Sequence, residues 1–104
     1  MTRSTLEQIT DLIVCIANPQ RVFLFGSQAD RTQTENSDLD LMIVVGDDVE
    51  DLRGLQISLH LEISSLTELP CDVLVEHEST FLRRSALPTI ERTILQKEQT
   101  LYAA

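Results

Sequence analysis

The stretch that most constrains the fold is Leu-Asp-Leu-Met-Ile-Val-Val at residues 39–45, which is apolar at every position but one. A strand with one face in water alternates apolar and polar side chains, because successive residues point to opposite faces. This stretch does not alternate, so it predicts a central strand that is covered on both faces. The rest of the chain must therefore supply elements for layers around a small sheet.

Apolar spacing and turn residues predict the other elements. In chain order we expect a helix over 6–16 that ends at Asn18-Pro19, a strand over 22–25 that stops at Gly26, a short helix within 27–37, the central strand over 39–45, an amphipathic helix over 52–66, a strand over 72–76, and a last helix from Pro88 supported by Ile90, Ile94 and Leu101. The predicted fold class is α/β (α+β), with a small mixed three-stranded sheet and about four to five helices.

The charge of the chain limits its partners. It has 104 residues, which we expect to form one domain over residues 1–104, and 17 Asp and Glu against 8 Lys and Arg give a net charge of -9. This excess disfavours a broad grip on nucleic acid, which relies on basic side chains to neutralise phosphates. We therefore expect no direct contact with nucleic acid, and any phosphate chemistry is expected to use metal ions.

No feature of the sequence indicates a membrane or secreted protein. The longest apolar runs are far below the roughly 20 residues of a membrane span, and residues 1–8 carry no secretory signal. Cys15 and Cys71 do not make a disulfide framework and are expected to be reduced thiols. We expect a cytoplasmic location.

Two carboxylates flank the first residue of the predicted central strand. Asp38 and Asp40 point to the same face, about 7 Å apart at Cα from the rise per residue. Two acids placed together on a buried strand repel each other and are costly to desolvate, and bound Mg²⁺ relieves both problems. A solvated turn just before the strand explains Asp-x-Asp equally well when the motif is taken alone.

The predicted topology brings further groups to this end of the sheet. A long helix connects the second and third strands, which implies a parallel right-handed crossover and places Asp72 beside Asp38 and Asp40. Gly26-Ser27, which could approach a phosphate closely, reaches the same end only if the first strand runs antiparallel to the second. Taken alone, a Gly-Ser pair after a strand is more often a turn, and an Asp at a strand start is more often a cap.

The spacing of these motifs resembles that of a known family. Gly-Ser-Gln-Ala at 26–29 is followed, ten residues from Ser27 to Ser37, by Ser-Asp-Leu-Asp-Leu at 37–41. With the third Asp and the strand order, residues from about 6 to 80 resemble the minimal nucleotidyltransferases of the DNA polymerase β superfamily. The resemblance implies the nucleotidyltransferase fold.

The resemblance also implies roles for individual residues. It implies that Asp38 and Asp40 bind two Mg²⁺ ions. Asp72 would complete the metal site and help to deprotonate the attacking hydroxyl. Gly26 and Ser27 would hold the β- and γ-phosphates of ATP, and the nucleotide site would also include Ser37 and Arg31. The family often has Ala-Arg-Gly where this chain has Ala29-Asp30-Arg31. Arg31 either substitutes for the usual Arg or faces solvent.

Proteins of this kind and size resemble the antitoxin half of HEPN/MNT toxin–antitoxin pairs. The resemblance implies that the chain transfers AMP from ATP to a Tyr hydroxyl of a HEPN ribonuclease toxin, with which it forms a hetero-oligomer. The negative charge suits a basic, RNA-cleaving partner. The alternative is an antitoxin with weak catalysis that neutralises its partner by binding and occlusion. Transfer to a small molecule is less favoured, because no second domain is available to grip it.

The remaining candidates have structural interpretations. His60 is expected at the boundary of the helix over 52–66, His77 at the opposite end of the sheet from Asp72, and Cys71 as a small buried thiol. The Arg83-Arg84 doublet is read as a solvated helix end before it is read as a contact for a nucleotide or an acidic partner. Leu95, Leu101 and Tyr102 form either part of a partner surface or, more often for such residues, part of the core.

Overall fold

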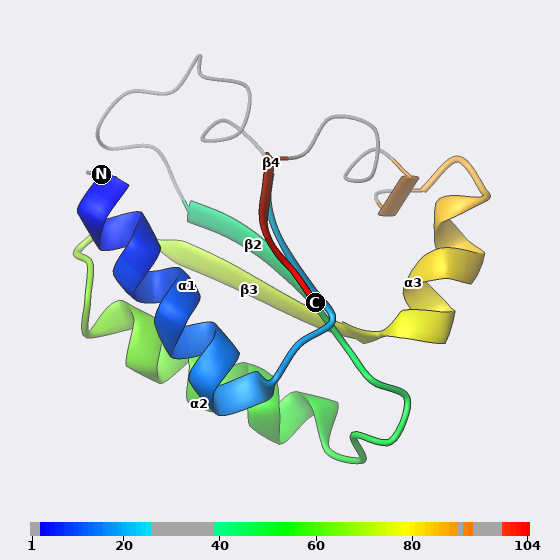
Figure 1. Ribbon diagram of the computed structural model, residues 1–104, viewed down its shortest axis with the longest axis horizontal. Coiled ribbons are helices and arrows are strands. Elements are labelled where there is room, and N and C mark those ends of the chain that lie inside the picture. Colours follow the sequence, from blue (N-terminus) through cyan, green and yellow to red (C-terminus); the bar gives the residue numbers. More distant parts are fainter. Residues whose placement is uncertain (1–2, 26–38, 90, 93–98) are drawn as a thin grey trace.

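The computed structural model describes residues 3–25, 39–89, 91–92 and 99–104 (Figure 1). In chain order its elements are α1 (Arg3–Ala17), β1 (Arg21–Phe25), β2 (Leu39–Val45), α2 (Leu52–Ser64), β3 (Cys71–His77), α3 (Glu78–Ser85) and β4 (Gln99–Ala103). Within these ranges no helix is long and apolar enough to cross a membrane.

The four strands form one mixed sheet in the order β3-β2-β1-β4. β2 and β3 are parallel, and β1 is antiparallel to both β2 and β4. The parallel pair confirms the crossover through α2, and the antiparallel β1 meets the condition that the sequence set for the Gly-Ser turn. The starts of β2 and β3 and the end of β1 therefore lie at the same end of the sheet.

Helices cover both faces of the sheet. α1 and α2 lie side by side on one face, where the larger core forms, and α3 lies on the other (Figure 1). The residues of β2 divide between the two cores: Leu41 and Ile43 belong to the larger one, whereas Met42 and Val44 pack in the smaller one. This division confirms the prediction of a central strand that is covered on both faces.

The smaller core depends on one residue of α3. Phe81 is the buried residue of this helix, and its ring stacks on Phe23 of β1 with a centroid separation of 5.4 Å. Offset or stacked aromatic pairs add stabilisation beyond the area that they bury. Phe81 therefore anchors α3 to the sheet.

The ends of the helices follow from local sequence. Asn18 adopts φ 45° after α1 and its amide donates to the carbonyl of Val14 at 3.1 Å. Asn tolerates this left-handed conformation, and the following Pro19 cannot continue the helix. At the start of α2, the Asp51 carboxylate accepts a hydrogen bond from the amide of Gly54 at 2.9 Å, as an N-cap residue does.

The C-terminal part differs from the prediction. Leu101 was assigned to a last helix, but it lies in β4, where Tyr102 pairs with Val22 of β1. Thr-Leu-Tyr-Ala is too short for its periodicity to separate a strand from a helix. The sheet therefore has four strands instead of three. Leu101 and Tyr102 pack against the larger core, which confirms the core interpretation of these two residues.

The helix α3 was not predicted as a separate element. Its sequence, Glu-Ser-Thr-Phe-Leu-Arg-Arg-Ser, buries a single side chain and so presents no apolar stripe. The described part of the chain contains three complete helices, and Glu91 and Arg92, in the range of the predicted last helix, are also helical. The short helix predicted within 27–37 lies outside the described residues.

Candidate active site

Asp40 and Asp72 lie side by side on adjacent strands. The parallel register of β2 and β3 pairs them directly, and neighbouring strands are about 4.8 Å apart. Side chains alternate along each strand, so Asp40 shares a face with Met42, and Asp72 shares that face with Leu74. The two carboxylates thus lie on the face that carries α3, at the beginning of both strands.

The end of β1 lies beside Asp40. Phe25, the last residue of β1, is the register partner of Asp40 on the side opposite Asp72. Asp40 is half-buried and Asp72 is exposed. The chain leaves β1 beside Asp40, and the next residues along the chain are Gly26 and Ser27.

Two of the predicted site residues lie within the described part of the chain. It brings Asp40 and Asp72 together, as the predicted topology required. Gly26, Ser27, Arg31, Ser37 and Asp38 lie outside the described residues. Within the described ranges, no group of three or more His, Cys, Asp or Glu side chains could hold a metal ion. The pair has the oxygen donors that Mg²⁺ prefers, and a third carboxylate would have to come from the predicted Asp38.

A groove of about 430 Å³ opens beside the two carboxylates. It is lined by Phe25, Asp40, Gln56, Ile57, His60, Leu61, Cys71, Asp72, Val73 and Leu74. Two of its apolar residues are largely open to solvent, Ile57 at 51% and Leu61 at 64% exposure. The site therefore joins a pair of acids to an apolar wall, which is typical of a ligand site with few, convergent polar groups. This wall was not predicted from the sequence.

Cys71 and His60 belong to the same groove. The Cys71 sulfur lies 3.6 Å from Nδ1 of His60 and 3.5 Å from the hydroxyl oxygen of Ser64. Cys71 is buried, as predicted, and His60 is exposed at the boundary of α2. His77 lies at the other end of β3, where its Nε2 is 2.5 Å from the carbonyl oxygen of Val49. The predicted separation of His77 from Asp72 is confirmed.

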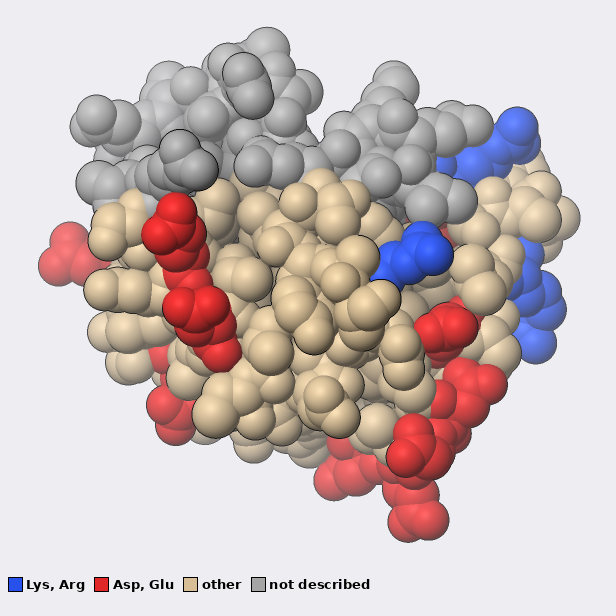
Figure 2. Space-filling model, viewed as in Figure 1, with Lys and Arg blue, Asp and Glu red and all other residues tan. Residues whose placement is uncertain are grey.

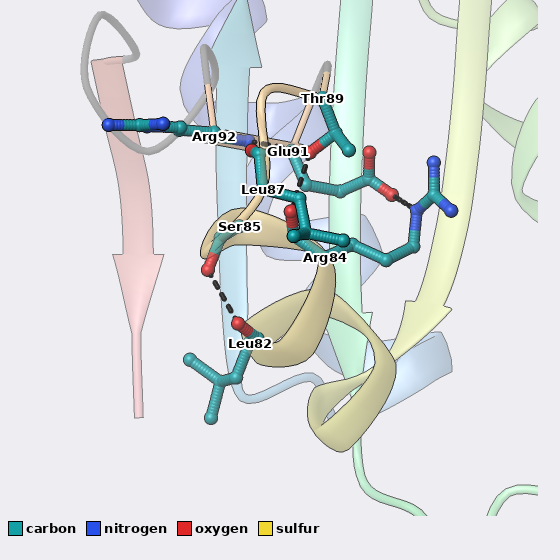
Figure 3. Close-up of polar contacts among 7 residues, drawn as sticks. All are labelled: Leu82, Arg84, Ser85, Leu87, Thr89, Glu91 and Arg92. Carbon is teal, nitrogen blue, oxygen red and sulfur yellow. Dashed lines mark hydrogen bonds and ion pairs between the residues drawn. The ribbon is translucent and has the colours of Figure 1, made fainter.

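Sequence reasoning missed a second pair of carboxylates on the same face. Glu76 follows Asp72 by four residues on β3, and Glu91 is buried at 1% exposure. Arg84 in the last turn of α3 donates a hydrogen bond from Nε to Glu91 (Figure 3). Thr89 fixes the intervening turn, since its hydroxyl donates to the carbonyl of Arg84 at 2.6 Å. Only the tertiary structure brings these side chains together.

These contacts shift the pKa values of both glutamates. Burial, followed by the neighbouring Glu91 carboxyl, raises the pKa of Glu76 to about 7. Burial also acts on Glu91, but the hydrogen bond from Arg84 and its charge outweigh it and lower the pKa of that carboxyl. Arg83 and Arg84 do end a helix, as predicted, and Arg84 also has a partner within the molecule.

The surface charge is unevenly distributed. On the face shown in Figure 2, acidic side chains gather over the loop between β2 and α2, and most of the basic atoms lie toward α3. In that loop Asp47 accepts a hydrogen bond from the amide of Ser79, at 3.0 Å, in the first turn of α3. This bond and the charge of His77 lower the pKa of Asp47.

A family model described as "Polymerase beta, Nucleotidyltransferase" matches residues 7–104. The search of curated proteins found no match. Among solved structures, a toxin–antitoxin complex with AMP-PNP has 20% sequence identity and a TM-score of 0.66, and the match covers 94% of this chain and 73% of that one.

Two further solved structures come from Shewanella oneidensis and Sulfolobus solfataricus. The complex of a tri-AMPylated HEPN toxin with an MNT antitoxin from Shewanella oneidensis matches at 15% identity and a TM-score of 0.65, over 100% of this chain and 74% of that one. A nucleotidyltransferase described as putative from Sulfolobus solfataricus matches at 16% identity and a TM-score of 0.61, over 96% and 78%. At these identities the structures establish the shared fold, and the nucleotidyltransferase fold implied by the sequence is confirmed.

Proposed function

Since the chain belongs to the polymerase β nucleotidyltransferase family, we propose that it is an antitoxin that transfers AMP from ATP to a hydroxyl of a HEPN ribonuclease toxin. The acceptor we propose is a Tyr, and the product is a silenced toxin in a hetero-oligomer with this chain. The proposal treats residues 1–104 as one catalytic domain that acts in the cytoplasm.

The observation that carries the proposal is the pairing of Asp40 with Asp72. In the proposed site Asp38 and Asp40 would hold two Mg²⁺ ions, and Asp72 would complete the set. When bound, Mg²⁺ supplies positive charge that neutralises the phosphates and favours in-line displacement. Asp72 also accepts the proton of the acceptor hydroxyl, which is a general-base role.

The proposed reaction is a nucleotidyl transfer. The acceptor oxygen forms a bond to the α-phosphorus of ATP as the bond between that phosphorus and the bridging oxygen to the β-phosphate breaks. Pyrophosphate leaves, and the hydroxyl proton passes to Asp72. Gly26 and Ser27 are proposed to hold the β- and γ-phosphates, and Ser37 and Arg31 to complete the nucleotide site.

Two of the solved structures support a HEPN toxin as the proposed partner of this chain. The Shewanella oneidensis complex contains a HEPN toxin that carries AMP groups together with an MNT antitoxin, and another toxin–antitoxin complex contains AMP-PNP. Both antitoxins share the fold of this chain. The net charge of -9 also favours association with a basic protein.

Neutralisation by occlusion is the second candidate. The sequence Ala29-Asp30-Arg31, in place of Ala-Arg-Gly, favours it because the basic residue of the expected phosphate contact is displaced by one position. Replacing both Asp38 and Asp40 by Asn separates the two candidates. If the double variant still protects the host from the toxin, catalysis is not the mechanism of neutralisation.

The direct test measures which phosphate of ATP is transferred to a protein. The protein and Mg²⁺ are incubated with a lysate of the host and with ATP labelled at either the α- or the γ-phosphate. The proposal requires that label reaches a protein from the α-phosphate only, and that protein is the acceptor. Label from the γ-phosphate only would indicate a kinase, and a co-purifying partner without label would indicate occlusion.

A further inference from the structure

We propose that the groove beside Asp40 and Asp72 is the docking surface for the acceptor protein, whose hydroxyl reaches the carboxylates from the β3 side of the sheet. This inference rests on the proposed nucleotidyl transfer. It adds the surface that selects the acceptor, with Ile57 and Leu61 of α2 as its specificity-determining residues.

The groove is continuous with the catalytic carboxylates. Its lining runs from Ile57 and Leu61 on α2, past Cys71 on β3, to Asp72 and Asp40. Its volume of about 430 Å³ lies within the usual range of sites for small ligands. Because α2 and the two carboxylates belong to opposite faces of the sheet, the groove passes around the edge strand β3.

The order of the strands decides from which side the acceptor enters. At this end of the sheet Asp72, Asp40 and Phe25 follow one another across β3, β2 and β1. Gly26 and Ser27, which we propose hold the β- and γ-phosphates, follow Phe25 in the sequence, so in the proposed site the pyrophosphate leaves on the β1 side. The attacking and leaving oxygens are roughly in line on opposite sides of the α-phosphorus. The acceptor must therefore approach from the β3 side, where the groove opens and where the described sheet ends.

The chemistry of the lining fits a protein segment. Ile57 and Leu61 are four residues apart on one helix, so their side chains are neighbours on its surface. Solvent-exposed apolar residues grouped in this way are typical of protein contact surfaces. Among the described residues that line it, the groove has two carboxylates and no Lys or Arg, which favours an acceptor with apolar residues around its hydroxyl and basic residues outside them. A Tyr combines an apolar ring with a hydroxyl and suits this wall.

The test uses the acceptor protein identified by α-phosphate labelling, in purified form. We compare wild type with I57S/L61S, and use L82S/L87S as the matched control. Leu82 and Leu87 are exposed to a similar extent, at 47% and 55%, but they do not line the groove. Each variant is assayed for the KM and kcat of transfer, for ATP binding by equilibrium dialysis with Mg²⁺, and for its melting temperature.

If the groove docks the acceptor, the variants should change the kinetic constants in a specific pattern. In I57S/L61S the KM for the acceptor rises at least tenfold, kcat and ATP affinity stay within about twofold of wild type, and the control changes in none of them. I57L/L61I, which keeps the wall apolar, restores the low KM. If the double variant melts early, the single variant L61S is used in its place.

Three outcomes would overturn the inference in different ways. An unchanged acceptor KM in I57S/L61S rejects the groove while nucleotidyl transfer stands. Weaker ATP binding with an unchanged acceptor KM assigns the groove to the nucleotide instead. If wild type labels no protein at all, the proposed function fails and the docking role fails with it.

Discussion

Asp40 and Asp72 are direct partners in the parallel register of β2 and β3. Two carboxylates on neighbouring strands repel each other at neutral pH, and a bound cation would relieve that repulsion. Such local conflicts with stability are typical of functional sites. This is why we propose a catalytic role for the pair.

We expect D40N to lose transfer activity by about 100-fold or more, because a catalytic metal supplies several kcal/mol of transition-state stabilisation and the variant lacks a proposed Mg²⁺ ligand. Mg²⁺ should raise the melting temperature of wild type by mass action and have little effect on the variant. D11N, which alters an exposed acid of α1, is the control. Full activity in D40N would contradict the proposed metal site.

The raised pKa of Glu76 predicts an unusual dependence of the stability of the fold on pH. Its pKa is raised to about 7 in the folded protein, from an ordinary value of 4.5, so the folded state holds a proton that the unfolded state has released. The free energy of unfolding therefore falls as pH rises from about 4.5 to about 7 and then levels off. After allowance for solvent screening, the loss is on the order of 1 kcal/mol.

The variant E76Q isolates this effect. It should match wild type in denaturant unfolding at pH 5 and exceed it at pH 8, because Gln cannot take the charge that Glu91 opposes. E62Q, which alters an exposed acid of α2, should follow the wild-type curve. Equal differences between E76Q and wild type at both pH values would contradict the assignment.

Asp47 provides the start of α3 with a cap that the helix itself lacks. The N-cap residue His77 makes no side-chain cap hydrogen bond, and the Asp47 carboxylate accepts from the amide of Ser79 instead. D47A should lower the melting temperature at pH 7. The lowered pKa of Asp47 means that this stabilisation is present above its ordinary value of 3.8 and is lost as pH falls below it. D48A, an exposed neighbour in the same loop, should have a smaller effect.

Phe81 should provide most of the packing energy that holds α3 against the sheet. Removing a buried aromatic side chain costs about 3 kcal/mol or more, and F81A should lose that amount in denaturant unfolding. F81L keeps most of the apolar volume and should lose less than about 1.5 kcal/mol. Equal losses in the two variants would show that the stacked contact with Phe23, rather than the volume, decides the stability.

Short-range patterns predicted the parts of the fold that have strong local signals. The apolar run at 39–45 and the spacing of Leu59 and Ile63 identified β2 and α2, and the crossover between β2 and β3 then placed Asp72 beside Asp40. The helix α3 buries one side chain and has no stripe to detect. The Glu76 and Glu91 pair could not be found, because it depends on how α3 turns the chain back over the sheet.

The pairing of β1 with β4 has a consequence for how the molecule is made. Residues 21–25 and 99–103 are neighbours in the sheet, yet a ribosome adding about 5–20 residues per second produces them several seconds apart. During that interval one edge of β1 lacks its partner, and open strand edges are sites of wrong pairing and aggregation. A chain released before residue 99 would keep that edge open, so this sheet is complete only when synthesis has passed its latest-made strand.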